Sequence, residues 1–150
     1  MEMKLKFRVN ANVKLELFDA EGKLKTTREI HNTVTDAGLY GVLDQLDDTP
    51  ALPIMDWMEL GTGTGGTTKL ATYIAGSRTA MDSRTRADEV LTSICTFGAG
   101  VGTGAVTEAG TFDVVTEDTI NMWMYASFTA IPKGAGDSLV ITWTLTAAAV

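Results

Sequence analysis

The sequence is short of the residues on which most catalytic and metal sites depend. Its 150 residues include one cysteine, Cys95, and one histidine, His31. A single cysteine cannot form a disulfide within the chain, and Cys95 lies in an apolar run that is typical of a buried core thiol. Histidine-dependent triads and zinc sites need partners that are not near His31 in the sequence. We therefore interpret His31 as a structural or surface residue.

Long apolar runs and an excess of positive charge are also missing. No stretch approaches the roughly 18 consecutive apolar residues of a membrane-spanning helix, and no signal peptide is visible. We therefore expect no membrane association, and synthesis in the cytoplasm. The 12 basic and 19 acidic residues give a net charge of −7. This balance argues against direct nucleic-acid binding, because phosphate contacts need a basic surface, but it is compatible with docking on a basic protein surface.

Alternation of apolar and polar residues is the dominant pattern that is present. Apolar residues occupy every second position from Leu5 to Leu17, which is the period of a strand with one buried face. The turn sequence Asp19–Gly22 then predicts a long hairpin over residues 4–30, with a charged second strand near a sheet edge. Further strands are predicted over residues 56–60, 79–81, 89–97, 106–113, 119–130 and 139–146.

One helix is expected after the hairpin. Thr35 or Asp36 is a suitable N-cap, and apolar residues follow at helical spacing: Leu39, Val42, Leu43 and Leu46. Because Gly38 and Gly41 lower the intrinsic helix propensity, we expect this apolar face to hold the helix against the sheet. The fold class predicted for residues 1–150 is mainly β, a single antiparallel β-sandwich domain (jelly-roll-like) with one short helix.

Two glycine-rich segments, Gly61–Lys69 and Gly98–Gly104, interrupt the strands. The first invites comparison with a phosphate-binding loop. It lacks the G-K-[ST] ending of a P-loop, and its G-x-G-x-x-G spacing lacks the βαβ unit of a dinucleotide site. We therefore expect an architectural loop and no bound cofactor.

Glu108 lies between glycine-rich segments, directly before Ala109-Gly110. We expect it to pin the first glycine loop by accepting backbone N–H groups, so that Gly61, Gly63, Glu108 and Gly110 form one structural unit. The carboxylate pairs Asp47–Asp48 and Glu117–Asp118 lack EF-hand spacing and are interpreted as solvated turns. No catalytic or metal-binding residues are assigned, and we expect the protein not to be an enzyme.

The aromatic residues are the remaining candidates for a binding surface. Trp143 alternates with other apolar residues and is expected in the core. Trp123 and Tyr125 share a half-polar face of their predicted strand, which is typical of a protein contact surface. Together with Phe18 and Trp57 they are the candidate interface residues. A sugar-binding platform is the alternative interpretation of these aromatic side chains.

Four motifs occur in a characteristic order along the chain. They are NTVTDAG at residues 32–38, MELGTGT at 58–64, TEAGTFD at 107–113 and DSLVITWT at 137–144. Over residues 32–146 this ordered set resembles a group of small virion structural proteins of tailed bacteriophages. The predicted hairpin 4–30 falls outside the motifs, and we expect it to serve assembly.

The resemblance implies a non-enzymatic building block of a virus particle. The function expected from it is that of a capsid decoration (cement) protein, which binds and stabilises the shell formed by the major capsid protein. The implied partners are the major capsid protein and copies of the chain itself, in a dimer or trimer, and the implied location is the virion. A tail or baseplate component is the first alternative, and a carbohydrate-binding module is the second.

Overall fold

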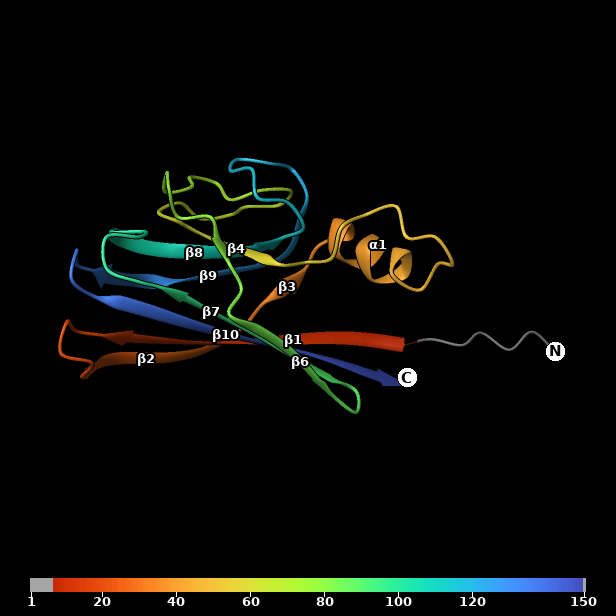
Figure 1. Ribbon diagram of the computed structural model, residues 1–150, viewed down its shortest axis with the longest axis horizontal. Helices are drawn as coiled ribbons and strands as arrows, with labels where there is room; N and C mark the ends of the chain where they lie inside the picture. Colours follow the sequence, from red (N-terminus) through yellow and green to blue (C-terminus); the bar gives the residue numbers. More distant parts are fainter. Residues whose placement is uncertain (1–6, 150) are drawn as a thin grey trace.

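The computed structural model describes residues 7–149, which form two antiparallel sheets packed face to face and one short helix (Figure 1). The strands of the first sheet are β1 (Phe7–Phe18), β2 (Leu24–His31), β6 (Ser83–Ala87), β7 (Val90–Phe97) and β10 (Ser138–Ala149). The strands of the second sheet are β3 (Thr33–Val34), β4 (Trp57–Gly61), β5 (Thr79–Ala80), β8 (Gly104–Phe112) and β9 (Met122–Lys133). The helix α1 spans Asp36–Asp44.

The strand orders are β2-β1-β10-β7-β6 in the first sheet and β3-β9-β8-β4-β5 in the second. The expectation of a mainly β sandwich with one short helix is confirmed, and the jelly-roll form of that expectation stays a prediction. β2 lies at a sheet edge, as predicted, and β7 lies inside the first sheet. β6 was not predicted, because its five residues are all exposed and show no alternation.

The predicted N-terminal hairpin is present over the described residues, and its residues 4–6 lie outside them. β1 and β2 pair antiparallel, with Val13 opposite Ile30. The turn closes through a hydrogen bond from the Gly22 amide to the Asp19 carbonyl oxygen, 3.0 Å, with Gly22 at a φ of 83°. β1 also pairs along its whole length with β10, so the first and last strands are neighbours.

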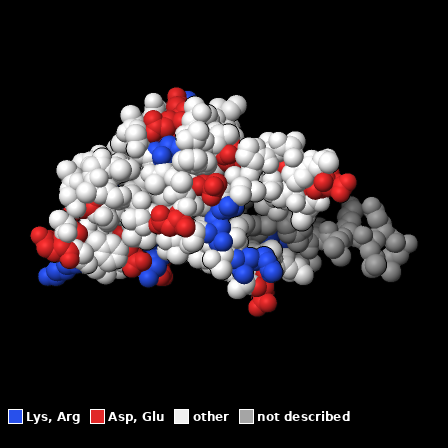
Figure 2. Space-filling view, in the orientation of Figure 1, with Lys and Arg blue, Asp and Glu red and all other residues white. Residues whose placement is uncertain are grey.

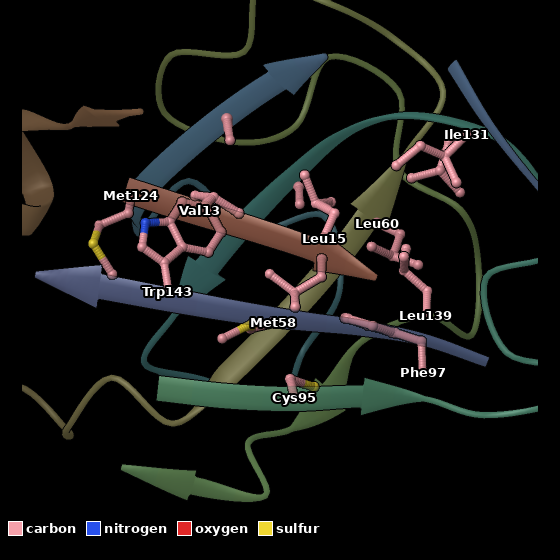
Figure 3. Close-up of a cluster of buried hydrophobic side chains, with 14 of the residues drawn as sticks. Val13, Leu15, Met58, Leu60, Cys95, Phe97, Met124, Ile131, Leu139 and Trp143 are labelled. Atoms are coloured by element: carbon pink, nitrogen blue, oxygen red, sulfur yellow. The ribbon is translucent and has the colours of Figure 1, made fainter. Parts of the chain in front are cut away.

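The core lies between the two sheets and is built from the alternating apolar positions (Figure 3). Fully or almost fully buried side chains come from both sheets: Val13, Leu15, Cys95, Ile141 and Trp143 from the first, and Met58, Leu60, Ala109, Met124 and Ile131 from the second. Removal of this apolar surface from water holds the two sheets together. It contributes about 25 cal/mol of free energy for each Å² of apolar area that is buried. The core positions predicted for Cys95 and Trp143 are confirmed, since both side chains are 0% exposed.

The outer face of the second sheet is covered as well. Long connections lie over β4, β8 and β9 in Figure 1. Beneath them is a smaller apolar cluster that contains Leu70, Phe112, Met122 and Tyr125, with Trp57 and Tyr73 packed against it. The second sheet is therefore buried on both faces over much of its area.

The helix begins where the sequence predicts it. The Thr35 side chain accepts a hydrogen bond from the Gly38 amide, 3.0 Å, as an N-cap does. The Thr35 amide donates to the Trp123 carbonyl oxygen, 2.9 Å, which ties the start of α1 to β9.

The predicted packing face of α1 is wrong. Gly38 and Gly41 are buried against Trp123, whereas the leucines of the helical segment point outward: Leu39 is 40% exposed, Leu43 53% and Leu46 78%. A Cβ atom at Gly38 would overlap the Trp123 backbone, and one at Gly41 would overlap the Trp123 ring. The helix therefore packs so closely on β9 only because these two residues have no side chain.

Candidate functional site

The Glu108 carboxylate is the centre of the glycine loop. It is fully buried in β8 and accepts four hydrogen bonds. Oε1 accepts from the amides of Gly63, 3.2 Å, and Thr72, 2.8 Å. Oε2 accepts from the Ala71 amide, 3.0 Å, and from the Tyr125 hydroxyl, 2.9 Å. The predicted contact between Glu108 and the glycine loop is confirmed.

Glycine is required at three positions around Glu108, because neighbouring atoms leave no room there for a Cβ atom. Gly61 is paired with Glu108 across the β4–β8 ladder, and a Cβ atom there would lie 2.5 Å from Glu108 Oε1. A Cβ atom at Gly63 would lie 3.0 Å from the same oxygen, and one at Gly110 would lie 2.6 Å from the Met122 sulfur. In a phosphate-binding loop the backbone amides point at the ligand. Here a carboxylate of the same chain accepts the Gly63 amide of this loop and the amides of Ala71 and Thr72 just beyond it.

Tyr125 supports Glu108 from the neighbouring strand β9. Burial raises the pKa of Tyr125 above its ordinary value, and the adjacent Glu108 carboxylate raises it further. The tyrosine therefore stays a neutral hydroxyl that donates its proton to Glu108 Oε2.

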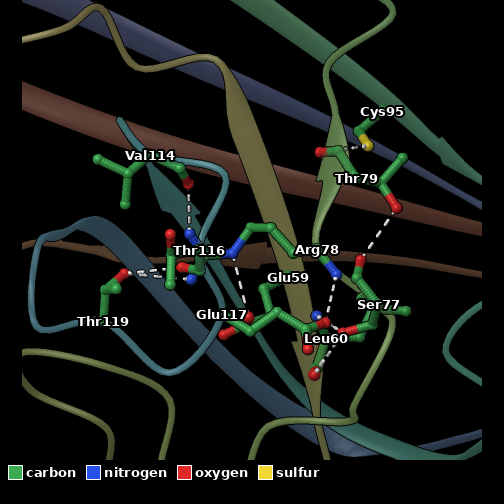
Figure 4. Close-up of polar contacts among 10 residues, drawn as sticks. All are labelled: Glu59, Leu60, Ser77, Arg78, Thr79, Cys95, Val114, Thr116, Glu117 and Thr119. Atoms are coloured by element: carbon green, nitrogen blue, oxygen red, sulfur yellow. Dashed lines mark hydrogen bonds and ion pairs between the residues drawn. The ribbon is translucent and has the colours of Figure 1, made fainter.

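A second buried polar cluster lies on the same sheet and centres on Arg78 (Figure 4). The Arg78 side chain is 2% exposed and pairs with Glu59 of β4, which is fully buried, at 3.0 Å from Nε to Oε2. Its guanidinium lies 3.6 Å from the centre of the Phe112 ring and donates to the Val114 carbonyl oxygen, 2.6 Å. The Arg78 amide donates to Glu117 Oε1, 3.2 Å.

This cluster fixes the connection between β8 and β9. Burial raises the pKa of Glu59, and the ion pair with Arg78 opposes that shift. A buried pair of this kind keeps its charges only with good geometry and further hydrogen bonds, and Arg78 obtains them from residues 114–119. Arg78 thus holds β4, through Glu59, to the loop of residues 114–119 between β8 and β9.

Sequence reasoning missed the Arg78 cluster. Glu59 stands between Met58 and Leu60, and a charged residue inside a buried strand is a signal that a covering partner exists. Its partner Arg78 lies 19 residues later, in a segment without any periodic pattern. Local spacing therefore cannot identify the pair.

The four candidate interface residues are not freely exposed. The prediction that Trp123 and Tyr125 form an exposed contact face is wrong: Trp123 is 6% exposed beneath α1, and Tyr125 is 8% exposed beside Glu108. Trp57 is half-buried in the smaller apolar cluster, and Phe18 is half-buried at the end of β1. The second sheet is covered on both faces, and an alternating pattern alone does not reveal that cover.

The exposed apolar surface lies instead at the α1 end. We use the term α1 surface for six large apolar residues that are 40% to 78% exposed: Leu39, Tyr40, Leu43, Leu46, Leu52 and Ile54. The Asp44 carboxylate accepts the amides of Ala51, 3.0 Å, and Leu52, 2.9 Å, and so folds the following loop back against the end of the helix. The loop that carries Leu52 and Ile54 therefore lies beside the end of α1.

An apolar hollow of about 310 Å³ opens beneath the helix. Its lining includes Val42 of α1, Leu46 and Ile54 of the loop that follows α1, Trp123 from β9, and Leu91 and Leu145 from the first sheet. Arg84 of β6 lies at the same hollow, where its Nε is 3.2 Å from Asp56 Oδ1. The hollow has the size and apolar lining of a site that receives a bulky side chain or a small ligand.

Across residues 7–149, no three His, Cys, Asp or Glu side chains gather in a way that would hold a metal ion. Within the same residues, no helix has the length and apolar character to cross a membrane.

Comparisons of the chain with protein-family models, with curated proteins and with solved structures found no match.

Proposed function

We propose that this protein is a non-enzymatic structural protein of a tailed-bacteriophage virion, and within the particle a capsid decoration protein that binds the shell of the major capsid protein. The ordered motifs of residues 32–146 support this proposal from the sequence. The single structural observation that carries it is the α1 surface. Among the described residues, six of the nine large apolar side chains that are exposed belong to that surface. Exposed apolar clusters of this kind mark protein contact sites.

The rest of the molecule suits a passive role in a particle. The loops over the second sheet are held by buried carboxylates, Glu108 and Glu59, and the two sheets share one core. A body of this kind keeps its contact surface in a fixed position. In a shell, many copies bind at once, so modest contacts at each copy add up to a large stabilisation.

Of the two alternative functions, we keep the tail or baseplate role and drop the carbohydrate-binding role. A tail or baseplate component would use the same fold and the same exposed surface, so it is separated only by experiment. The carbohydrate-binding alternative depended on exposed tryptophans. Trp143 is fully buried, Trp123 is 6% exposed and Trp57 is half-buried, so we do not propose it.

The test is binding to isolated capsids. Purified protein is mixed with expanded capsids that were assembled without it, and the capsids are sedimented and imaged by cryo-electron microscopy. We expect saturable binding at fixed positions of the shell and a higher disruption temperature of the decorated particles. Failure to bind capsids, together with co-purification with tails, would overturn the decoration role in favour of the tail role.

A further inference from the structure

We propose that the α1 surface, together with the hollow beneath it, is a docking site for a basic amphipathic segment of a partner protein, which places one bulky apolar side chain in the hollow. This inference rests on the proposed function, because it names the chemistry of the partner segment that an assembly protein would meet. It follows from three observations: how α1 is held, what its exposed side chains are, and which charges surround them.

The exposed leucines are not needed to hold the helix. α1 is fixed by the Thr35 cap, by the bond from the Thr35 amide to the Trp123 carbonyl oxygen and by the close packing of Gly38 and Gly41 on Trp123. Leu39 and Leu43 are 40% and 53% exposed, and Leu46, which follows the helix at the edge of the hollow, is 78% exposed. Exposure of large apolar side chains to water is unfavourable for a single chain, and binding of a partner that covers them lowers the free energy.

The hollow supplies a place for an anchor. Val42 of α1 and Leu46 just after the helix form one wall, and Leu91, Leu145 and Trp123 line the rest. At about 310 Å³ it is large enough for one bulky side chain of a partner. Contact surfaces obtain most of their affinity from a few such anchors in well-packed pockets.

The charged side chains of the segment that carries the α1 surface are all acidic. Residues 36–56 contain five aspartates and no lysine, arginine or histidine. Asp36, Asp47 and Asp48 are exposed, and Figure 2 shows acidic but no basic atoms at the outer tip of this segment. Arg84 is the cation at the hollow, and its charge is already paired with Asp56. An acidic rim on the α1 side of the apolar centre favours a partner that carries lysine or arginine beside its apolar anchor.

A direct binding test uses synthetic peptides of about 12 residues as probes. The first is an amphipathic peptide of Lys, Leu and one Trp, the second has Glu at every Lys position, and the third has Ser at every Leu and Trp position. Binding is measured by fluorescence anisotropy of a terminal label. We expect the first peptide to bind at least about tenfold more tightly than either of the others, and its affinity to fall as NaCl is raised from roughly 50 to 300 mM.

Matched variants locate the site. Asp47→Asn with Asp48→Asn removes two exposed charges from the rim, and Glu21→Gln with Glu29→Gln removes two exposed charges elsewhere. Leu43→Ser with Leu46→Ser changes the apolar surface, and Leu24→Ser changes an exposed leucine of β2. We expect the aspartate variant of the rim and the leucine variant of the apolar surface each to weaken binding of the Lys peptide by about threefold or more. We expect each of the two control variants to change that affinity by less than about twofold. Equal binding by the rim variant and its control, or no binding of the Lys peptide to the unmodified protein, would overturn the inference.

The same variants, added to capsids, separate this inference from the proposed function. If the unmodified protein binds capsids and the Leu43→Ser, Leu46→Ser variant binds equally well, the inference is overturned and the decoration role stands. If no form binds capsids and the Lys peptide still depends on the α1 surface, the decoration role is overturned and the docking site stands. Loss of capsid binding in the α1 variants alone supports both.

Discussion

Glu108 joins segments that are far apart in the sequence, since its carboxylate holds the amides of Gly63, Ala71 and Thr72 and the hydroxyl of Tyr125. We predict that Glu108→Ala lowers the free energy of unfolding by about 2–4 kcal/mol, because three amides lose a charged acceptor. Tyr125→Phe removes one bond only and is expected to cost about 1 kcal/mol. Guanidinium unfolding followed by tryptophan fluorescence measures both.

The control for this prediction is Glu21→Ala, at an exposed carboxylate of the β1–β2 turn. We expect its effect to stay within about 0.5 kcal/mol. A Glu108→Ala variant as stable as the control would show that the carboxylate does not hold the loop.

Asp137 makes the stability of the fold depend on pH in the acid range. The Lys25 ammonium, 2.9 Å away, and the Gly134 amide hold the pKa of the Asp137 carboxyl below its ordinary value of 3.8. A carboxyl group whose pKa is lower in the folded chain stabilises the fold above its unfolded pKa, and this contribution is lost as the pH falls through the folded pKa. We therefore expect Asp137→Asn to flatten the loss of stability between about pH 5 and pH 2.

Urea unfolding at a series of pH values measures this dependence. Lys25→Met is expected to flatten the same region in part, because the Gly134 amide remains. Asp48→Asn, at an exposed carboxylate without a partner in the described residues, serves as the control and is expected to leave the curve unchanged. A pH dependence that is identical in Asp137→Asn and the unmodified protein would refute the assignment.

At the scale of elements, α1 packs through glycines rather than leucines. Alanine has a helix propensity about 1 kcal/mol better than glycine, so helix propensity alone predicts that Gly38→Ala stabilises the protein. We expect the opposite, a loss of about 1–3 kcal/mol, because the added methyl group overlaps the Trp123 backbone and forces α1 away from β9. Thermal unfolding followed by circular dichroism measures the change.

Gly98→Ala is the matched substitution, since a Cβ atom at Gly98 meets nothing within 4 Å. We expect it to change the free energy of unfolding by less than about 0.5 kcal/mol. If Gly38→Ala were as stable as Gly98→Ala, the close packing of α1 on β9 would be wrong.

At the scale of the whole molecule, Cys95 reports on the opening of the core. It is 0% exposed, and burial raises the pKa of its thiol to about 12, with the Asp82 charge adding to the shift. Thiol reagents need an accessible thiolate, so we expect Cys95 to react only when the sheets separate. Because Cys95 and Trp143 share one core, the guanidinium midpoint of thiol labelling is expected to coincide with that of tryptophan fluorescence.

A Cys95→Ser, Ser83→Cys variant supplies the comparison, because Ser83 is exposed on the edge strand β6. Its thiol is expected to react without denaturant. Rapid labelling of Cys95 under native conditions would contradict a core that opens only as a unit.

Several features follow from the sequence by itself. The alternation from Leu5 to Leu17 predicts β1, the Asp19–Gly22 turn predicts its hairpin with β2, and an N-cap at Thr35 or Asp36 predicts the start of α1. The contact between Glu108 and the glycine loop was also predicted. These signals are local: a period of two, a turn that needs a positive φ at glycine, and a cap that satisfies free amides act within a few residues.

Only the tertiary structure decided which faces are covered and by what. The loops over the second sheet bury Tyr125, the glycines of α1 let the helix cover Trp123, and Arg78 finds Glu59 across a segment with no pattern. The same packing turns Leu39, Leu43 and Leu46 outward and so creates the α1 surface. The physical reason is that an apolar pattern shows that a face favours burial, whereas the partner that buries it comes from distant residues, and a glycine that permits close approach carries no apolar signal of its own.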